Sequence, residues 1–233
     1  MTTEQAALNN AVWCEAVCRA HDRPGAFGPR AWSNPARTPV FYPDAVTLSP
    51  EATPDDVLAA IDAGPGASVK DSFASLDLRP AGFEVLFEAT WLHRPAPPGG
   101  PPAGDIVWHV VRDAGALRAW EHACFGGEPQ DLFRPPLLAD EAVAILSGTR
   151  GGDIVCGSVL NATRAPIGPM GETVGVSNVF AGPGDLDAAW AGTIARAAAL
   201  FPGRPLVGYE SDPAPAAAHG FTPAGPLRVW LKA

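Results

Sequence analysis

The sequence predicts a mixed α/β fold in which a largely antiparallel sheet is flanked by helices. Strand-like and helix-like segments alternate after residue 104, and one closing structure occurs twice in the chain. Hydrophobic residues make up 47% of the 233 residues and charged residues 18%, which is enough apolar side chain for a substantial core. These three observations favour a folded α/β protein over a disordered or all-helical one.

The repeated closing structure is a Gly-Phe pair followed by a strand that contains a tryptophan. Gly82-Phe83 leads to Trp91, and Gly220-Phe221 leads to Trp230, so the Gly-to-Trp spacing is 9 residues in the first copy and 10 in the second. Such self-similarity indicates two related supersecondary units. We therefore expect a tandem arrangement.

A segment rich in proline and glycine, residues 94–104, separates the two copies. Proline lacks a backbone donor and glycine disfavours regular structure, so the segment reads as a semi-rigid linker. The predicted organisation is a truncated unit at 1–93, the linker at 94–104 and a complete unit at 105–233.

The second unit begins with a predicted strand and two predicted helices. Asp105–Val111 has strand character, and the helix from Asp113 to Cys124 has apolar residues three and four positions apart. After a Pro-Pro loop, the spacing of apolar residues predicts another helix at Ala139–Leu146.

Its remaining part should complete the sheet. A carboxylate at Asp185 is typical of a helix N-terminus, and that helix should run through Ala197. The other predicted elements are strands at Ile154–Leu160 and Thr173–Phe180, a strand at Leu206–Tyr209, a short helix at Ala214–Ala218 and a strand at Leu227–Leu231.

The first unit matches this order only in outline. A helix is predicted at Asn10–Arg19, and Asp55–Ile61 resembles Asp140–Leu146 in pattern. Nothing in the first unit is expected to match the second-unit segment from Ile154 to Leu200, so the first copy is predicted to lack the central hairpin and the long helix.

Charge and composition exclude several classes of partner. The net charge of −9 argues against nucleic acid and against anionic membrane surfaces. No apolar run is long enough to span a bilayer, and the N-terminus lacks a secretion-signal pattern, so a cytoplasmic location is expected. The His and Cys spacings predict no metal site, and the four cysteines are expected to be buried free thiols.

Residues 105–233 resemble the GNAT superfamily of acetyl-CoA-dependent N-acetyltransferases. The resemblance rests on the order of elements, on the strand and glycine-rich loop from Val174 to Gly184, and on Gly220-Phe221 before a last strand. It implies a V-shaped split between the fourth and fifth strands for acetyl-CoA or another acyl-CoA, with the pyrophosphate on backbone N–H groups before the long helix. The residues that it places at the cofactor are Val179, Phe180, Ala181, Gly182, Gly184 and Asp185.

The sequence also departs from the family pattern at this loop. Pro183 removes one N–H donor, and Asp185 and Asp187 bring negative charge toward a polyanionic ligand. The interpretation favoured for Asp185 is that its side chain caps the helix.

A second departure concerns proton transfer. Where many family members carry a general-acid tyrosine, four residues before Gly-Phe, this chain has Ala216. The nearest candidates are Tyr209 and Glu210, and Glu210 could act as general base if burial raises its pKa. The alternative is that Glu210 is a solvated strand end and Tyr209 a core residue.

The function implied by the resemblance is acyl-CoA-dependent N-acylation, with an amine of a small molecule or peptide as acceptor. One alternative is a non-catalytic GNAT-like module that binds a ligand or partner, and another is a GNAT-fold enzyme of different chemistry. The acceptor, the acyl group and the placement of the two units stay open, as does the choice between a monomer and a homodimer.

Overall fold

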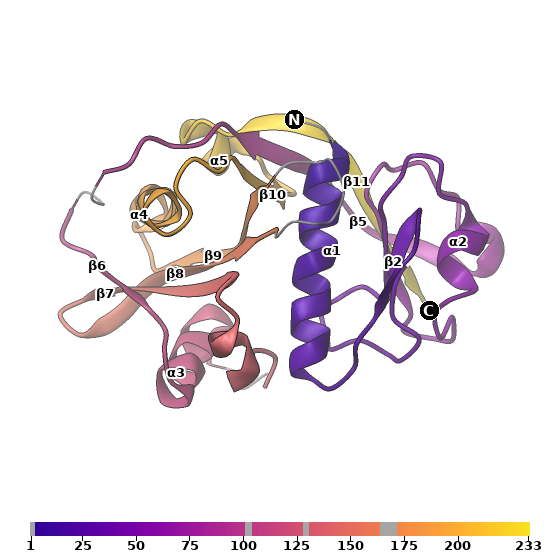
Figure 1. Ribbon diagram of the computed structural model, residues 1–233, viewed down its shortest axis with the longest axis horizontal. Helices are drawn as coiled ribbons and strands as arrows, with labels where there is room; N and C mark the ends of the chain where they lie inside the picture. The colour runs from indigo at the N-terminus through magenta and orange to yellow at the C-terminus, as the bar shows by residue number, and fades with distance from the viewer. Residues whose placement is uncertain (1–2, 101–103, 128–130, 164–171) are drawn as a thin grey trace.

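Two strands from distant parts of the chain lie side by side in the middle of one sheet. The computed structural model describes residues 3–100, 104–127, 131–163 and 172–233. Its sheet has 11 strands in the order β1-β2-β3-β4-β11-β5-β10-β9-β8-β7-β6 (Figure 1). The mixed, mainly antiparallel sheet flanked by helices confirms the predicted fold class.

The central strands are β5 (Phe83–Arg94) and β11 (Thr222–Lys232), which pair antiparallel along most of their length. Each follows a short helical turn that ends in a left-handed glycine, with φ 81° at Gly82 and 82° at Gly220. Phe83 and Phe221 then turn into the core and are 1% and 3% exposed. The two Gly-Phe pairs therefore have the same local conformation, a left-handed turn that glycine adopts without steric cost.

One half of the sheet precedes β5 in the sequence. It begins with α1 (Thr3–Ala20) and continues with β1 (Ala26–Phe27), β2 (Ala31–Ser33), β3 (Ala45–Thr47), α2 (Pro54–Leu58), β4 (Ser68–Asp71) and the 3-10 turn η1 (Arg79–Ala81). The other half contains β6 (Val107–Val110), α3 (Ala114–Cys124), η2 (Pro135–Ala139), β7 (Val143–Arg150), β8 (Asp153–Ala162), β9 (Val174–Ala181), α4 (Leu186–Leu200), β10 (Leu206–Glu210) and α5 (Ala214–Ala218).

The two halves share a crossover that sequence analysis did not expect in the first. In the second half, α4 joins the parallel strands β9 and β10; in the first, α2 joins the parallel strands β3 and β4. The helix at this place in the first half has only five residues, whereas α4 has 15, so the first half has a shorter crossover and no crossover helix of comparable length. A Thr53 capping box and Pro54 begin α2, and its shortness hid the equivalence.

The helix predicted at Ala139–Leu146 is also wrong. The chain forms η2 up to Ala139 and then enters strand β7 at Val143. Consecutive residues of β7 are buried, since helices cover both faces of the sheet at this point. An apolar run of that kind has no strict alternation, so Val143 and Leu146 matched helical spacing by coincidence.

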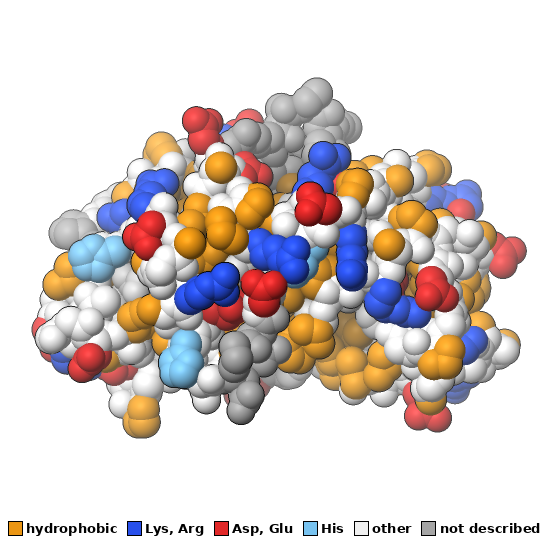
Figure 2. Space-filling view, turned by 90° about the horizontal axis from the view of Figure 1, so that it is seen from below, with side chains coloured by type: hydrophobic (Ala, Val, Ile, Leu, Met, Phe, Trp, Pro, Cys, Tyr) orange, Lys and Arg blue, Asp and Glu red, His pale blue; other side chains and the backbone are white. Residues whose placement is uncertain are grey.

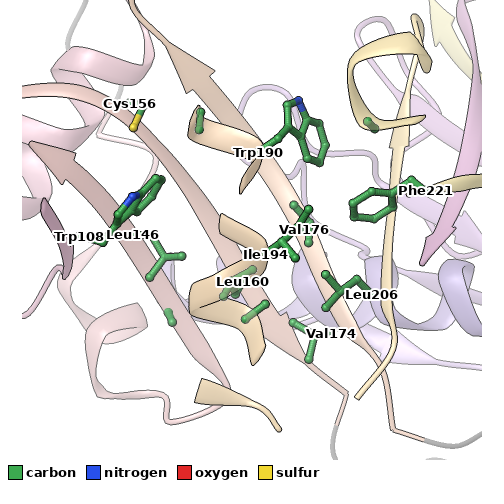
Figure 3. Packing of buried hydrophobic residues seen from close by; sticks show 14 of the residues in the cluster. Trp108, Leu146, Cys156, Leu160, Val174, Val176, Trp190, Ile194, Leu206 and Phe221 are labelled. Atoms are coloured by element: carbon green, nitrogen blue, oxygen red, sulfur yellow. The ribbon is translucent and has the colours of Figure 1, made fainter. Parts of the chain in front are cut away.

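Two apolar cores cover opposite faces of the second half. On one face α4 packs on β7–β9 and β10, where Trp190 meets Phe221 with ring centroids 5.4 Å apart (Figure 3). On the other face, α1 and α3 enclose Trp13, Trp120 and Phe133. The core therefore lies on both sides of β8 and β9, which fixes these strands firmly.

Helix α1 connects the two halves of the sheet across one face (Figure 1). Its buried Asn9 donates to the Asn161 carbonyl at 3.0 Å and to Thr163 Oγ1 at 2.8 Å. Asn161 in turn donates to the Asn9 carbonyl at 3.2 Å. These paired amides anchor the helix beside the place where β9 and β10 meet.

The predicted linker follows β5, which ends at Arg94. Residues 95–100 have no regular structure, and 101–103 lie outside the described residues. Because β5 from the first unit lies between β10 and β11 from the second, the sheet runs across both predicted units. The division at 94–104 stays a prediction about chain segments. Among the described helices, none combines the length and apolarity of a membrane span.

Candidate functional site

The site is built where strands β9 and β10 separate. Their parallel pairing covers Leu206 with Val174 and Val207 with Gly175, after which no pairing continues. β10 keeps its position because it pairs with β5 along its whole length, from Leu206 opposite Arg94 to Glu210 opposite Thr90. The two strands therefore open into a V, as the family resemblance implies.

Gly208 lies at the point of separation. A methyl group at this position would come within 2.8 Å of the Val176 carbonyl oxygen, which is closer than a carbon atom tolerates. The absence of a side chain thus allows β10 to approach β9 closely before the strands part.

A cavity of about 360 Å³ occupies the opening. Its walls come from β9 and β10, from α1, from the segment before β3 and from the segment after α3. The residues that line it are Asn10, Trp13, Cys14, Phe41, Tyr42, Pro43, Lys70, Phe125, Leu132, Val176, Ser177, Asn178, Val179, Tyr209 and Glu210. Both halves of the chain therefore contribute to one site.

A bulge in β9 faces this opening. Val159 pairs with Ser177 and Gly157 with Phe180, so β9 carries one residue more than β8 between these pairs. Asn178 adopts φ 51°, a left-handed conformation that asparagine tolerates better than most residues. A bulge leaves backbone groups out of the ladder, and here such groups lie at the cavity wall.

Glu210 ends β10 and lines this cavity. Burial raises the pKa of its carboxyl from 4.5 to about 7, and the nearby negative charge of Asp212 contributes to the same shift. A carboxyl group with such a pKa exchanges its proton near neutral pH. The condition that sequence analysis set for a general base is therefore met, although its role in a reaction stays a prediction.

Tyr209 also lines the cavity, and its ring is held on two sides. Trp91 packs against it edge-on with centroids 5.4 Å apart, and Lys70 Nζ lies 4.1 Å from the ring centroid. The ring is half-buried and forms part of the wall beside Glu210.

The residues predicted to bind the cofactor lead, in sequence order, from the cavity between β9 and β10 to the start of α4. Val179 lines the cavity, while the Phe180 ring packs edge-on against Trp120 at 5.4 Å. Ala181 pairs with Cys156 at the end of β9, and the Gly182 N–H donates to the Val155 carbonyl at 2.8 Å. The main-chain groups of the strand and of Gly182 are thus largely committed to the sheet.

The free donors lie further along, at the start of α4. The N–H groups of a first helical turn have no intrahelical partner, and they carry the positive end of the helix dipole. Gly184, with φ 83°, turns the chain into this helix. The geometry suits an anionic group placed at Gly184 and the first residues of α4.

The carboxylates of this loop contact side chains that lie far away in the sequence. Arg150, at the end of β7, binds Asp185 at 2.8 Å and Asp105 at 2.7 Å. His219, after α5, contacts Asp187 at 3.0 Å. The arginine lowers the pKa of the Asp185 carboxyl through hydrogen bonding and charge, so Asp185 stays ionised and paired.

This pairing corrects the interpretation of Asp185 as a capping side chain. Asp185 occupies the N-cap position, but its carboxylate makes no capping hydrogen bond and binds Arg150 instead. Sequence reasoning missed Arg150 because the residue becomes a neighbour of the loop only through the pairing of β7 with β8 and β8 with β9.

Ala216 belongs to α5 and is fully buried against the core. Its methyl side chain cannot donate a proton. Histidine, cysteine and carboxylate groups form no three-residue cluster suited to a metal among the described residues.

Cys14 lies at the cavity but is not prepared for nucleophilic chemistry. Burial raises the pKa of its thiol to about 11 and that of Cys18 to about 12. The nucleophilic form of cysteine is the thiolate, which is scarce at such pKa values. The prediction of buried free thiols is confirmed for Cys14, Cys18 and Cys156, whereas Cys124 is free but only partly buried.

Two site residues in particular were not found from the sequence, namely Lys70 and Asn10. Both come from the first half of the chain. Asn10 belongs to α1, which packs against β9 and β10. Lys70 belongs to β4, and its side chain reaches the Tyr209 ring although β11 and β5 lie between β4 and β10. On the face shown in Figure 2, basic side chains lie beside acidic ones instead of gathering in one patch.

Comparison with solved structures shows the fold of the GCN5-related N-acetyltransferases. A GCN5-related N-acetyltransferase from Kribbella flavida matches with TM-score 0.62 and 14% identity, covering 97% of this chain and 95% of that one. A protein assigned to the GNAT family of acetyltransferases from Novosphingobium aromaticivorans matches with TM-score 0.58 and 13% identity, over 97% and 99% of the two chains. No family model matches the sequence, and no curated protein matches it. At this identity the likeness establishes the fold, and it extends over the whole chain.

Proposed function

We propose that this protein transfers an acyl group from acyl-CoA to an amine. The observation that carries the proposal is Glu210, a carboxyl with a pKa of about 7 at a cavity that opens between two diverging parallel strands. The structural neighbours that are named as acetyltransferases share the fold of this chain over almost its whole length, which supports the proposal.

The residues present suit acyl-CoA as co-substrate. Gly184 and the first turn of α4 offer N–H groups at the positive end of a helix of 15 residues, which favours the pyrophosphate. Asp185 is paired with Arg150, so its charge is offset at the place where a polyanion would bind. The pantetheine arm would then run from this loop between β9 and β10 into the cavity.

In the reaction, the neutral amine attacks the thioester carbonyl carbon and forms a C–N bond. Backbone N–H groups at the β9 bulge near Asn178 and Val179 would stabilise the oxyanion. Glu210, in its ionised form, takes the proton that the amine nitrogen loses, directly or through a water molecule. The C–S bond then breaks, and CoA leaves as a thiolate that takes its proton from solvent.

A second candidate is a non-catalytic binding module. Ala216 supports it, because a buried methyl group stands where many GNAT enzymes carry a general acid for the thiolate. This candidate predicts binding at the cavity without turnover.

Two measurements separate these candidates. Thermal unfolding with acetyl-CoA tests binding, since a ligand at a hundred times its dissociation constant adds about 2.7 kcal/mol of stability. Thiol release in the presence of amine acceptors then tests turnover, with Glu210→Gln as the active-site variant and Glu84→Gln, an exposed carboxylate on β5, as matched control. Binding without thiol release for any amine would favour the module, and absence of binding would overturn the acyl-CoA proposal.

A further inference from the structure

A second, larger cavity adjoins the one between β9 and β10. The second cavity measures about 680 Å³ and lies between the 37–44 segment and the strands β4, β5 and β11. The two share a set of lining residues, namely Phe41, Tyr42, Pro43, Lys70 and Tyr209. Lys70 therefore lies at the wall of both cavities.

Lys70 is a buried cation at this junction. Its side chain belongs to β4 and is 4% exposed. Its ammonium group donates to Asn10 Oδ1 at 2.9 Å and lies over the Tyr209 ring. Within the described part of the chain, no carboxylate forms an ion pair with it.

A buried ammonium group without a carboxylate partner is energetically unfavourable. An ammonium group carries three N–H donors, and Asn10 accepts only one of them. Burial of a charge without an opposite charge is costly, so buried lysines are normally paired. The unmet charge at a cavity wall points to an anionic group of a ligand.

The other charges around the second cavity are already satisfied by one another. Arg37 binds Asp44 at 2.8 Å and Asp62 at 3.3 Å. The buried Asp44 also accepts hydrogen bonds from the Thr38 and Ser68 N–H groups. Lys70 is therefore the charge that this cavity leaves for a ligand.

The rest of the second cavity offers an apolar wall. Val40, Phe41 and Leu86 line it and are exposed to 55%, 70% and 53%, and Val229 and Leu231 from β11 add further apolar surface. Exposed side chains of this size, gathered at one concave place, favour a ligand with an apolar portion.

We infer that the acceptor is an amine that also carries a carboxylate and an apolar group, the chemistry of an apolar amino acid or of a short peptide that ends in one. The carboxylate binds Lys70, the apolar group occupies the larger cavity, and the amine lies in the smaller cavity with Glu210. This inference rests on the proposed function for the amine, but the binding of the carboxylate does not depend on acyl transfer.

The first experiment therefore uses no CoA. Calorimetric titration compares 3-phenylpropionate with its neutral amide, 3-phenylpropionamide. The carboxylate should bind wild-type protein about tenfold more tightly or better, since hydrogen bonds to charged groups are the strong ones. Lys70→Met should remove this preference, Lys70→Arg should retain part of it, and Lys232→Met should retain it all, because Lys232 lies outside both cavities and donates to the Ala81 carbonyl.

Wild-type protein alone can overturn the inference. It would do so if the acid and the amide bound equally well, or if neither bound at millimolar concentration.

A second experiment follows thiol release with L-phenylalanine and L-phenylalaninamide as acceptors. Lys70→Met should raise KM for the acid about tenfold and leave KM for the amide unchanged. Carboxylate binding without any thiol release would instead contradict the proposed function and leave the anion site standing.

Discussion

Arg150 and Asp185 form an ion pair of 2.8 Å that joins the end of β7 to the loop before α4. The same guanidinium binds Asp105 at 2.7 Å, next to the start of β6. One arginine therefore offsets the carboxylate that lies closest to the predicted pyrophosphate site. The loop is acidic in sequence, but in the folded protein Arg150, 35 positions before Asp185, offsets the negative charge of that residue.

Replacement of Arg150 by Met should weaken acetyl-CoA binding. The change leaves Asp185 without its partner at the helix N-terminus, where its charge would repel the pyrophosphate. Because the pair is accessible to solvent, we expect a loss of about two- to fivefold in affinity, more at low salt than at high salt. Calorimetric titration at two ionic strengths measures it. The double variant Arg150→Met with Asp185→Asn should recover most of the affinity, and failure to recover would show that the arginine acts in another way.

Activity should rise with pH through the region near 7, where Glu210 loses its proton. The general-base role requires the carboxylate, and burial raises the pKa of this group to about 7. Asp212→Asn removes a negative charge that contributes to the raised pKa, so the rising limb of the profile should move to lower pH. The profile of kcat/KM for wild-type protein and this variant gives the test, and Glu210→Gln should lose the limb together with most of the activity.

The raised pKa of Glu210 also determines how the stability of the folded protein changes with pH. A carboxyl whose pKa is higher in the folded state holds its proton more tightly there, so its stabilising contribution is present below about pH 4.5 and is lost as the pH rises through about 7. Glu210→Gln cannot lose a proton. Relative to wild type, this variant should become more stable as the pH rises from about 5 to about 8.5.

The expected gain is on the order of 1–2 kcal/mol, because partial exposure reduces the roughly 3 kcal/mol that a shift of this size would represent in a fully buried site. Urea unfolding at both pH values measures it. Glu84→Gln should show no such pH dependence, and an equal gain in that control would assign the effect to net charge.

The elements that sequence reasoning placed correctly have strong local signals. The α4 segment has an acidic start and a long apolar pattern, and the Gly82-Phe83 and Gly220-Phe221 pairs need a left-handed turn that favours glycine. Pairing across the sheet has no such local signal. β5 ends at Arg94 and β10 begins only at Leu206, yet the two strands are neighbours in the sheet. The neighbours of β5 therefore follow from packing and not from sequence order.

Some residues of the candidate site could likewise be predicted from the sequence, and others could not. Glu210 and Tyr209, which line the cavity, could be selected from the sequence because they end a recognisable strand at a place that the family resemblance defines. Lys70 and Asn10 were missed because they belong to the first half and meet β10 only in the assembled sheet. A lysine within a strand gives no sign in the sequence that it is buried, since most lysines are exposed.

The matching tryptophans of the repeat should differ in how they tolerate replacement. Trp91 and Trp230 are both 1% exposed, so truncation of either to Ala should cost about 3–5 kcal/mol. Trp91 Nε1 donates to the Ser72 carbonyl at 2.8 Å, whereas Trp230 Nε1 has no hydrogen-bond partner in the described structure.

Trp91→Phe should therefore destabilise by about 1–3 kcal/mol more than Trp230→Phe, since it leaves a buried carbonyl unsatisfied. Denaturant unfolding of the two Phe variants measures the difference. If the free energy of unfolding falls by the same amount in both variants, the hydrogen bond from Trp91 to Ser72 contributes nothing beyond the packing of the ring.

Gly208 provides a test of the opening itself. In Gly208→Ala the added methyl group would meet the Val176 carbonyl oxygen at 2.8 Å, and a backbone atom cannot move away as a flexible side chain can. β10 must then shift from β9 at the point where the strands part, at a cost of about 1–3 kcal/mol in stability. The displacement also changes the width of the V, so acetyl-CoA affinity should fall. Gly99→Ala is the control, because a methyl group there meets nothing within 4 Å. A Gly208→Ala variant with wild-type stability and affinity would show that close approach of β9 and β10 is not what shapes the site.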